Sequence, residues 1–134
     1  MVDLFSRWKT DSYGMDGNVK RNGVEYVASP EIKLYCTGGL FNSQSNIFTG
    51  AAAERYIESM YADMVFFSSQ AISADGEISD VSEEETALRK KMLARAKKKI
   101  FLCDSSKIGF QKTFTLCNKD DIDFIICDKP LPRE

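Results

Sequence analysis

Short, unbroken apolar runs alternate with helix-length segments along this chain, and the alternation restricts the fold more than any other feature. The runs occupy residues 64–67, 100–103 and 123–127. Each is too short to form a helix, and none has the alternating polar positions of a strand with one side in solvent. Strands of this kind belong to parallel sheets covered by helices. The sequence therefore predicts an α/β fold with a mostly parallel sheet and helices on both faces.

Two helices are predicted between the strands. Apolar residues recur at helical spacing over residues 49–61, and Thr49 is available as the N-cap. The second helix begins at Ser82, where the sequence Ser-Glu-Glu-Glu fits a capping box, and it extends to about Lys99. We expect the lysines at residues 97–99 to complement the dipole of this helix.

Further short strands are predicted over residues 32–36 and 113–116. The first of these is a β-prone run that Gly38 and Gly39 bring to an end. The tetrapeptide at residues 74–77 contains Asp-Gly and is a turn signal. These elements complete the predicted sheet.

Length and composition are those of one compact domain. The chain has 134 residues, 43% of them apolar, which is enough for a single core. We therefore predict one domain over residues 22–134, after an irregular lead-in over residues 1–21, which are polar and rich in glycine. The N-terminus lacks the basic and apolar segments of a signal peptide, and no apolar stretch approaches ~18 residues. The cytoplasm is the expected compartment.

Charge and the absence of histidine restrict the function. A net charge of -2 gives no general attraction to nucleic acid. Without histidine, neither a Ser-His-Asp nor a Cys-His nucleophilic arrangement is possible. The four cysteines are widely spaced and form no Cys-x-x-Cys pair, so we interpret them as buried thiols and expect no metal or cofactor. They are Cys36, Cys103, Cys117 and Cys127.

The strongest candidate site is the polar segment Asp104–Lys107, which follows the run over residues 100–103. Ligands of open α/β sheets bind beyond the carboxyl ends of the strands, so the polar loops after the apolar runs are the candidate positions. These loops are residues 37–39, 68–70, 104–107 and 128–129. An acid, two hydroxyls and a cation could hold a hydroxylated anion at residues 104–107. The alternative is a surface turn, because Asp-Ser-Ser is ordinary turn chemistry.

Two other pairs of residues are candidates with equally plain alternatives. Gly38 and Gly39 could let the backbone approach a ligand, or could only end a strand. Glu85 and Arg89 lie four residues apart on the second helix, so they could reach a pocket or form an exposed ion pair. The residues alone leave both alternatives open.

Taken together, residues 22–132 resemble the C-terminal sensor domain of DeoR-type bacterial transcriptional repressors. The combination of motifs is more specific than any one of them. The match runs through Asn22–Gly23, Thr37–Gly39, Thr49–Gly50, Tyr61–Phe66, Asp75–Gly76, Glu85–Met92, Cys103–Gly109 and Asp121–Asp128.

The resemblance implies a Rossmann-like α/β fold of the NagB/RpiA/CoA transferase-like type, used for sensing rather than turnover. Such domains bind phosphorylated sugars or related metabolites as effectors, and we expect a homo-oligomer with no membrane contact. The resemblance places the loop at Asp104–Lys107 and the Gly38–Gly39 turn around the effector pocket. The residues expected to bind the ligand are Asn22, Gly38, Gly39, Thr49, Gly50, Glu85, Arg89, Asp104, Ser106 and Lys107.

The chain departs from the family pattern in two respects. Family repressors begin with a DNA-reading helix-turn-helix, and residues 1–21 have neither the length nor the apolar spacing for one. Family sensor domains also open with a strand and an Asp-Ser-Gly-Thr-Thr phosphate loop, a sequence absent here. We therefore expect a sensor domain truncated at its N-terminus, lacking its first strand and phosphate loop, that contacts DNA only through a helix-turn-helix outside this chain.

Two further functions stay open on the sequence alone. An enzyme of the related isomerase class would use Glu85 as a proton-transferring base and Lys107 as a phosphate ligand. A non-binding interaction module would account for the missing phosphate loop, and an exposed sheet edge would favour its pairing with another chain.

Overall fold

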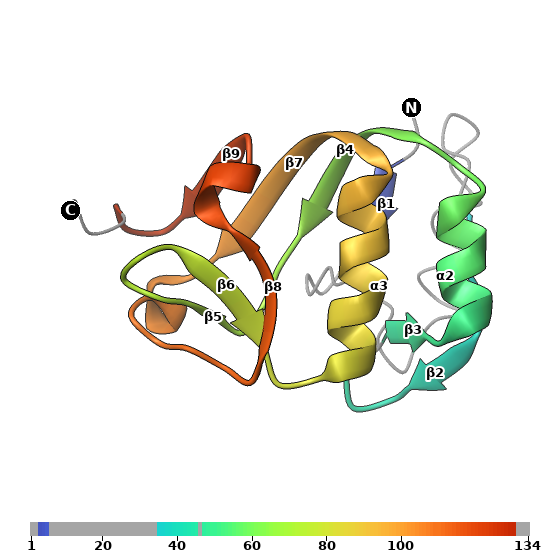
Figure 1. The fold of residues 1–134 in the computed structure, drawn as a ribbon, viewed down its shortest axis with the longest axis horizontal. Helices are drawn as coiled ribbons and strands as arrows, with labels where there is room; N and C mark the ends of the chain where they lie inside the picture. The colour runs from blue at the N-terminus through green and yellow to red at the C-terminus, as the bar shows by residue number, and fades with distance from the viewer. Residues whose placement is uncertain (1–2, 6–34, 46, 131–134) are drawn as a thin grey trace.

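The computed structural model describes residues 3–5, 35–45 and 47–130 (Figure 1). The strands are β1 (Asp3–Phe5), β2 (Leu40–Asn42), β3 (Ile47–Thr49), β4 (Ala62–Phe67), β5 (Ala71–Ile72), β6 (Glu77–Asp80), β7 (Ala96–Cys103), β8 (Phe114–Asn118) and β9 (Phe124–Cys127). The helices are α2 (Ala51–Glu58) and α3 (Glu83–Ala94), with single 3-10 turns η1 (Ser105–Lys107) and η2 (Lys119–Asp121).

The central sheet has the strand order β1-β4-β7-β9, and every pairing in it is parallel. The predicted parallel sheet is therefore confirmed, and the chain is a mixed α/β structure. Because all four strands run the same way, their carboxyl ends meet at one edge of the sheet. The loops that follow β4, β7 and β9 leave from that edge.

One face of the sheet is packed against the helices and forms the core. Val65, Phe67 and Phe101 are buried on this face, where Phe67 and Phe101 pair in register with ring centroids 5.1 Å apart. Leu88 and Met92 of α3 belong to the same buried cluster. Burying side chains of this size contributes about 1.5–3 kcal/mol each.

The opposite face of the sheet is partly open in the described part of the chain. Phe124 and Ile126 of β9 are 57% and 56% exposed, and both point away from the core face. Figure 1 shows α2 and α3 on the same side of the sheet. Neither described helix covers this second face, where the sequence had predicted a helix.

A second sheet of three antiparallel strands, β5-β6-β8, packs beside the first. The hairpin between β5 and β6 turns at Gly76, whose φ of 90° suits glycine, so the turn predicted over residues 74–77 is confirmed. The apolar run over residues 113–116 belongs to this antiparallel sheet as part of β8. The antiparallel sheet was not predicted.

The first predicted helix is present as α2, but its predicted cap is wrong. Thr49 is the last residue of β3, where it pairs with Leu40. Gly50 occupies the N-cap position with φ 91° and ψ 176°, and no side chain caps the helix. Hairpin pairing therefore places Thr49 in the strand, where its hydroxyl does not cap α2.

The second helix begins as predicted, with Ser82 as the N-cap of α3. The Ser82 hydroxyl accepts a hydrogen bond from the amide of Glu85 at 3.2 Å. The reciprocal arm of a capping box does not form, because the Glu85 carboxylate binds Arg89 instead. No helix in the described part of the chain is both long and apolar enough to cross a bilayer.

The predicted end of the second helix at Lys99 is wrong. The helix stops at Ala94, and the lysines at residues 97–99 lie in β7. Ala96, Lys98 and Lys99 pair with residues of β4. This strand pairing outweighs the weak dipole interaction that the lysines could have made at a helix end.

Three other predictions need correction. The cysteines are not buried thiols: Cys36 is exposed and the other three are half-buried. Tyr35 and Cys36 are irregular rather than part of a strand, while residues 32–34 lie outside the described residues. The lead-in over residues 1–21 is not wholly irregular, since Asp3–Phe5 form β1.

The Gly38–Gly39 turn leads into the β2-β3 hairpin, and both glycines have positive φ, at 64° and 102°. A Cβ at Gly39 would lie 2.6 Å from the carbonyl oxygen of Thr49 and 3.2 Å from the Cβ of Ala53. A Cβ at Gly38 would meet nothing within 4 Å. Gly39 therefore permits close packing of this turn against β3 and α2.

We expect Gly39→Ala to destabilise the domain more than Gly38→Ala. Both substitutions place a side chain at positive φ, which costs about 1 kcal/mol. Gly39→Ala also forces a backbone carbonyl to move, at a further cost of roughly 1–3 kcal/mol. Urea unfolding of the two variants measures the difference, and equal free energies of unfolding would contradict the packing described here.

Candidate functional site

Polar residues gather where β4, β7 and β9 end, at the carboxyl edge of the parallel sheet. Ser68 follows β4, Asp104 follows β7 and Asp128 follows β9. Lys107 Nζ donates to Ser68 Oγ at 3.2 Å. The Ser105 amide and hydroxyl donate to the two carboxylate oxygens of Asp128 at 2.6 and 3.0 Å. The three strand ends are thus joined through η1.

The η1 turn is built by its own sequence. Asp104 is its N-cap, and the carboxylate accepts hydrogen bonds from the amide of Ser106, at 3.0 Å, and from the Ser106 hydroxyl. Lys107 Nζ lies 3.7 Å from the second carboxylate oxygen of Asp104. These local hydrogen bonds favour a turn at residues 104–107. The turn directs the Lys107 ammonium toward Ser68 at the end of β4.

Both carboxylates of this site stay ionised well below neutral pH. The hydrogen bonds from Ser106 lower the pKa of Asp104, and the Lys107 ammonium lowers it further. The hydrogen bonds from Ser105 lower the pKa of Asp128. Because these pKa values lie below the ordinary Asp value, the hydrogen bonds stabilise the fold fully above that ordinary value. The stabilisation is lost as pH falls through the lowered pKa. Both carboxylates are therefore charged acceptors for the η1 hydrogen bonds at neutral pH.

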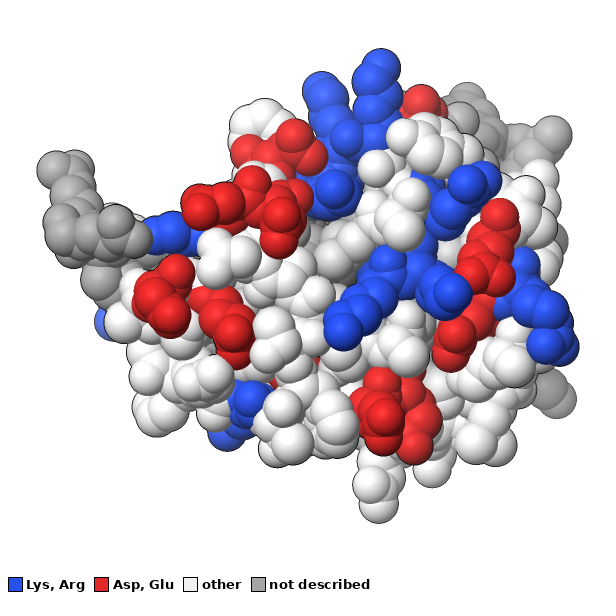
Figure 2. All heavy atoms as spheres, viewed as in Figure 1, with Lys and Arg blue, Asp and Glu red and all other residues white. Residues whose placement is uncertain are grey.

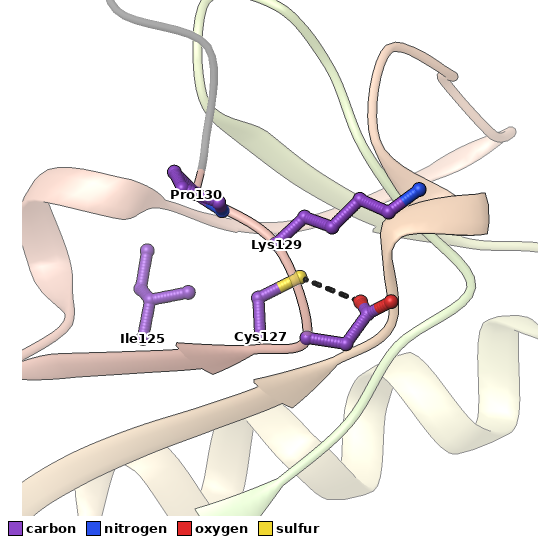
Figure 3. A pocket seen from close by; sticks show the side chains of 5 residues that line it. Ile125, Cys127, Lys129 and Pro130 are labelled. Atoms are coloured by element: carbon purple, nitrogen blue, oxygen red, sulfur yellow. Dashed lines mark hydrogen bonds between the residues drawn. The ribbon is translucent and has the colours of Figure 1, made fainter.

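An open cavity of about 410 Å³ adjoins η1, and Figure 3 shows the side chains around it. The Cys127 sulfur points toward the Asp128 carboxylate, to which it donates at 3.4 Å. The lining residues are Ile125, Cys127, Asp128, Lys129 and Pro130. The cavity carries one acidic and one basic side chain on an otherwise apolar wall.

The predicted site residues fall into three groups in the structure. Asp104, Ser106 and Lys107 lie together in η1, at the carboxyl edge where they were predicted. The loops that begin at Ser68 and Asp128 were predicted as candidate positions because they follow apolar runs, but neither residue was among those expected to bind the ligand. Asn22 lies outside the described residues.

The second group lies at the start of α2 and comprises Gly38, Gly39, Thr49 and Gly50. The structure brings Gly39 against Thr49, as described above. Added Cβ atoms at Gly38 and Gly50 would meet nothing within 4 Å, so the backbone there is open to approach. Whether this group contacts the same ligand as η1 stays a prediction.

The third group, Glu85 and Arg89, is buried in an ion-pair network. Arg89 donates to Glu85 at 2.8 Å and to Asp80 of β6 at 3.0 Å. Arg89 is 0%, Asp80 1% and Glu85 5% exposed. The alternative of an exposed helix pair is therefore wrong, and the residue that sequence reasoning missed is Asp80. A ligand contact by Glu85 or Arg89 stays a prediction.

The buried network extends to the loop after β4. The Ser69 hydroxyl lies 2.8 Å from the carbonyl oxygen of Ser79 and 3.2 Å from Asp80 Oδ2. Asp80 also accepts from the amides of Val81 and Ser82, at 2.7 and 3.3 Å. The network therefore ties β6 and the start of α3 to the residue that follows Ser68.

Surface charge does not form a single-sign field on the face that Figure 2 shows. Lysine and arginine side chains alternate there with aspartate and glutamate side chains. Nucleic acid binders present a concentrated basic surface. This face therefore lacks the electrostatic pattern of a nucleic-acid interface.

The parallel sheet and the helices packed on it make this chain a mixed α/β domain whose polar loops meet at the carboxyl edge of the sheet. The model of the DeoR C terminal sensor domain family matches residues 24–129. The chain belongs to this family, and the resemblance seen in the sequence is confirmed.

Curated relatives of the chain are named as transcriptional regulators. A putative aga operon transcriptional repressor from Escherichia coli O157:H7 is 31% identical over 103 residues, covering 77% of this chain and 38% of the relative. The HTH-type regulator GolR from Listeria innocua is 27% identical over 110 residues, covering 82% and 43%. The L-fucose operon activator from Haemophilus influenzae is 26% identical over 106 residues, covering 79% and 43%. The match thus spans about two fifths of each relative.

We expect Arg89→Ala to destabilise the domain by about 3–5 kcal/mol, because it leaves two buried carboxylates without their cation. The matched control is Lys91→Ala on the same helix, which removes a largely exposed pair with Glu58. Surface pairs of this kind contribute little. Urea unfolding tests both variants, and a small effect of Arg89→Ala would show that the network is not needed for stability.

Proposed function

We propose that this domain is the effector-sensing part of a DeoR-type regulator and binds a phosphorylated sugar or related metabolite at η1. Lys107 would bind the phosphate, and Ser68 and Ser106 would bind phosphate or sugar oxygens. The observation that carries the proposal is the position of the Lys107 ammonium, held at 3.2 Å from Ser68 where the strands end. A cation fixed in advance loses less side-chain freedom when an anion binds.

The chemistry around Lys107 fits a ligand that is both anionic and hydroxylated. The ammonium and the Ser105 and Ser106 hydroxyls suit phosphate oxygens, while Asp104 and Asp128 can accept from sugar hydroxyls. The names of two relatives, an aga operon repressor and an L-fucose operon activator, support regulation by carbohydrate-related metabolites.

The open backbone at Gly38 and Gly50 would supply further ligand contacts beside α2. Both glycines are free of close neighbours and have positive φ. Amide groups at such positions can approach an oxygen closely. The proposed pocket would therefore use the carboxyl edge of the sheet on one side and the α2 start on the other.

Binding without turnover is the function we favour over isomerisation. The alternative enzyme needs Glu85 as a base, but its carboxylate is engaged by the Arg89 guanidinium at 2.8 Å. The Glu85 carboxylate is thus occupied by a buried ion pair rather than held free as a base. The relatives quoted above are likewise named as regulators.

We also propose that the regulator is a homo-oligomer and contacts DNA through a helix-turn-helix rather than through this domain. The mixed charge of the face in Figure 2 agrees with this division. The exposed β9 side chains Phe124 and Ile126 offer an apolar surface for association. Sedimentation analysis that finds only monomers at micromolar concentration would reject the oligomer.

We expect one or more phosphorylated sugars to raise the melting temperature of the chain. A ligand at 100 times its Kd stabilises by about 2.7 kcal/mol, a shift of several degrees. Lys107→Ala should weaken binding about 10- to 100-fold, since hydrogen bonds to charged groups contribute about 1.5–3 kcal/mol. Lys112→Ala, an exposed lysine on the following segment, is the matched control.

Thermal-shift screening finds the ligand and titration calorimetry measures Kd for both variants. Equal loss of affinity in the two variants would place the anion elsewhere than η1. The absence of stabilisation by any member of a broad sugar-phosphate panel would reject the proposed sensing function.

A further inference from the structure

Two of the four cysteines lie opposite each other on neighbouring strands of the central sheet. Cys103 is the last residue of β7 and Cys127 the last of β9, and they are register partners in the parallel pairing of these strands. Register partners point to the same face of a sheet, and neighbouring strands are about 4.7–4.9 Å apart. Disulfides span Cα separations of about 4.4–6.8 Å, so this pair lies within bridging distance.

Both thiols are half-buried in the reduced protein. Burial, together with the neighbouring Cys127 thiol, raises the pKa of Cys103 to about 12. Cys103 is therefore a protonated, partly buried thiol opposite a second cysteine on the neighbouring strand. Such a pair is organised for a bond between the sulfurs.

Access to the pair is from the side of Cys127. Its side chain lines the open cavity of about 410 Å³ beside Lys129 (Figure 3). Its thiol donates a hydrogen bond to the Asp128 carboxylate at 3.4 Å. A small oxidant can therefore reach Cys127 from solvent, whereas Cys103 does not line this cavity.

We propose that Cys103 and Cys127 form a reversible oxidative modification site, at which a peroxide closes the two thiols into a disulfide. The inference goes beyond the proposed effector binding and does not depend on it.

The reaction runs in two balanced steps. Deprotonated Cys127 sulfur attacks a peroxide oxygen, so that an S–O bond forms, the O–O bond breaks and the released hydroxide takes a proton to become water. The Cys103 sulfur then attacks the resulting sulfenic acid, forming the S–S bond and releasing a second water. The two thiols lose two electrons and the hydrogen peroxide gains them. An added dithiol reverses the change by thiol–disulfide exchange.

The bond would act directly on the candidate site. Cys103 precedes Asp104, which caps η1, and Cys127 precedes Asp128, which holds Ser105. A disulfide would thus join the ends of β7 and β9, which carry the two aspartates that hold η1 in place.

The other two cysteines are matched internal controls. Cys36 is exposed and irregular, and Cys117 of β8 is the register partner of Ile78 rather than of a cysteine. Burial also raises the pKa of Cys117 to about 12, with a further contribution from the Asp121 charge. If exposure or burial alone decided reactivity, one of these two would react in preference to the pair.

The test treats the folded chain with hydrogen peroxide, alkylates the remaining thiols and maps the disulfides by mass spectrometry without reduction. We expect loss of two hydrogen atoms from the protein and one cross-linked peptide pair containing Cys103 and Cys127, reversed by dithiothreitol. The variant Cys36→Ser/Cys117→Ser should form the same cross-link at a rate within about twofold, since its reactive pair is intact. Cys103→Ser should instead accumulate a sulfenic acid on Cys127 that dimedone traps.

Several outcomes would overturn the proposal. In the unmutated chain, full alkylation of Cys103 and Cys127 after peroxide would do so, as would oxidation to sulfinic acids without a cross-link. A Cys103–Cys127 link that forms only in urea would show that the folded strands do not present the pair. Because these readouts need no substitution, they stand even where a serine variant fails to fold.

Discussion

The parallel pairing of β4 with β7 is the interaction on which the rest of the structure depends. It draws the lysines that follow α3 into a strand, and so ends the helix at Ala94. It also sets Phe67 opposite Phe101 at the centre of the core. The same register brings the loops after both strands to one edge, where Ser68 meets Lys107. Helix length, core packing and site geometry thus have a common cause.

Much of the fold could be predicted from local pattern, and what was missed depends on distant partners. The apolar runs predicted β4, β7 and β9, and Ser82 predicted the start of α3, because both signals are complete within a few residues. The end of α3 depends on a strand more than thirty residues earlier, and Thr49 depends on Leu40. Local helix signals cannot report such competition, since strand pairing is decided by tertiary structure.

The candidate site shows the same division. The turn at Asp104–Lys107 was predictable because its capping bonds lie within the segment itself. Its anchors at Ser68 and Asp128 were not assigned, since they come from other strands. The burial of Arg89 could not be predicted either, because the carboxylate of Asp80 that helps to neutralise it belongs to a different element. A helical i,i+4 pair looks the same in sequence whether it faces solvent or the core.

The loop after β4 carries two adjacent serines with different surroundings. Ser68 faces Lys107 at the surface, whereas Ser69 is wholly buried beside Asp80. One peptide unit therefore separates the candidate anion site from the ion-pair network that anchors α3. A ligand that displaced Lys107 from Ser68 would act next to Ser69. Ser69 cannot move without disturbing its hydrogen bond to the buried Asp80 carboxylate. The two serines thus connect the surface contact of Lys107 to the hydrogen bond of Ser69 with Asp80 in the buried network.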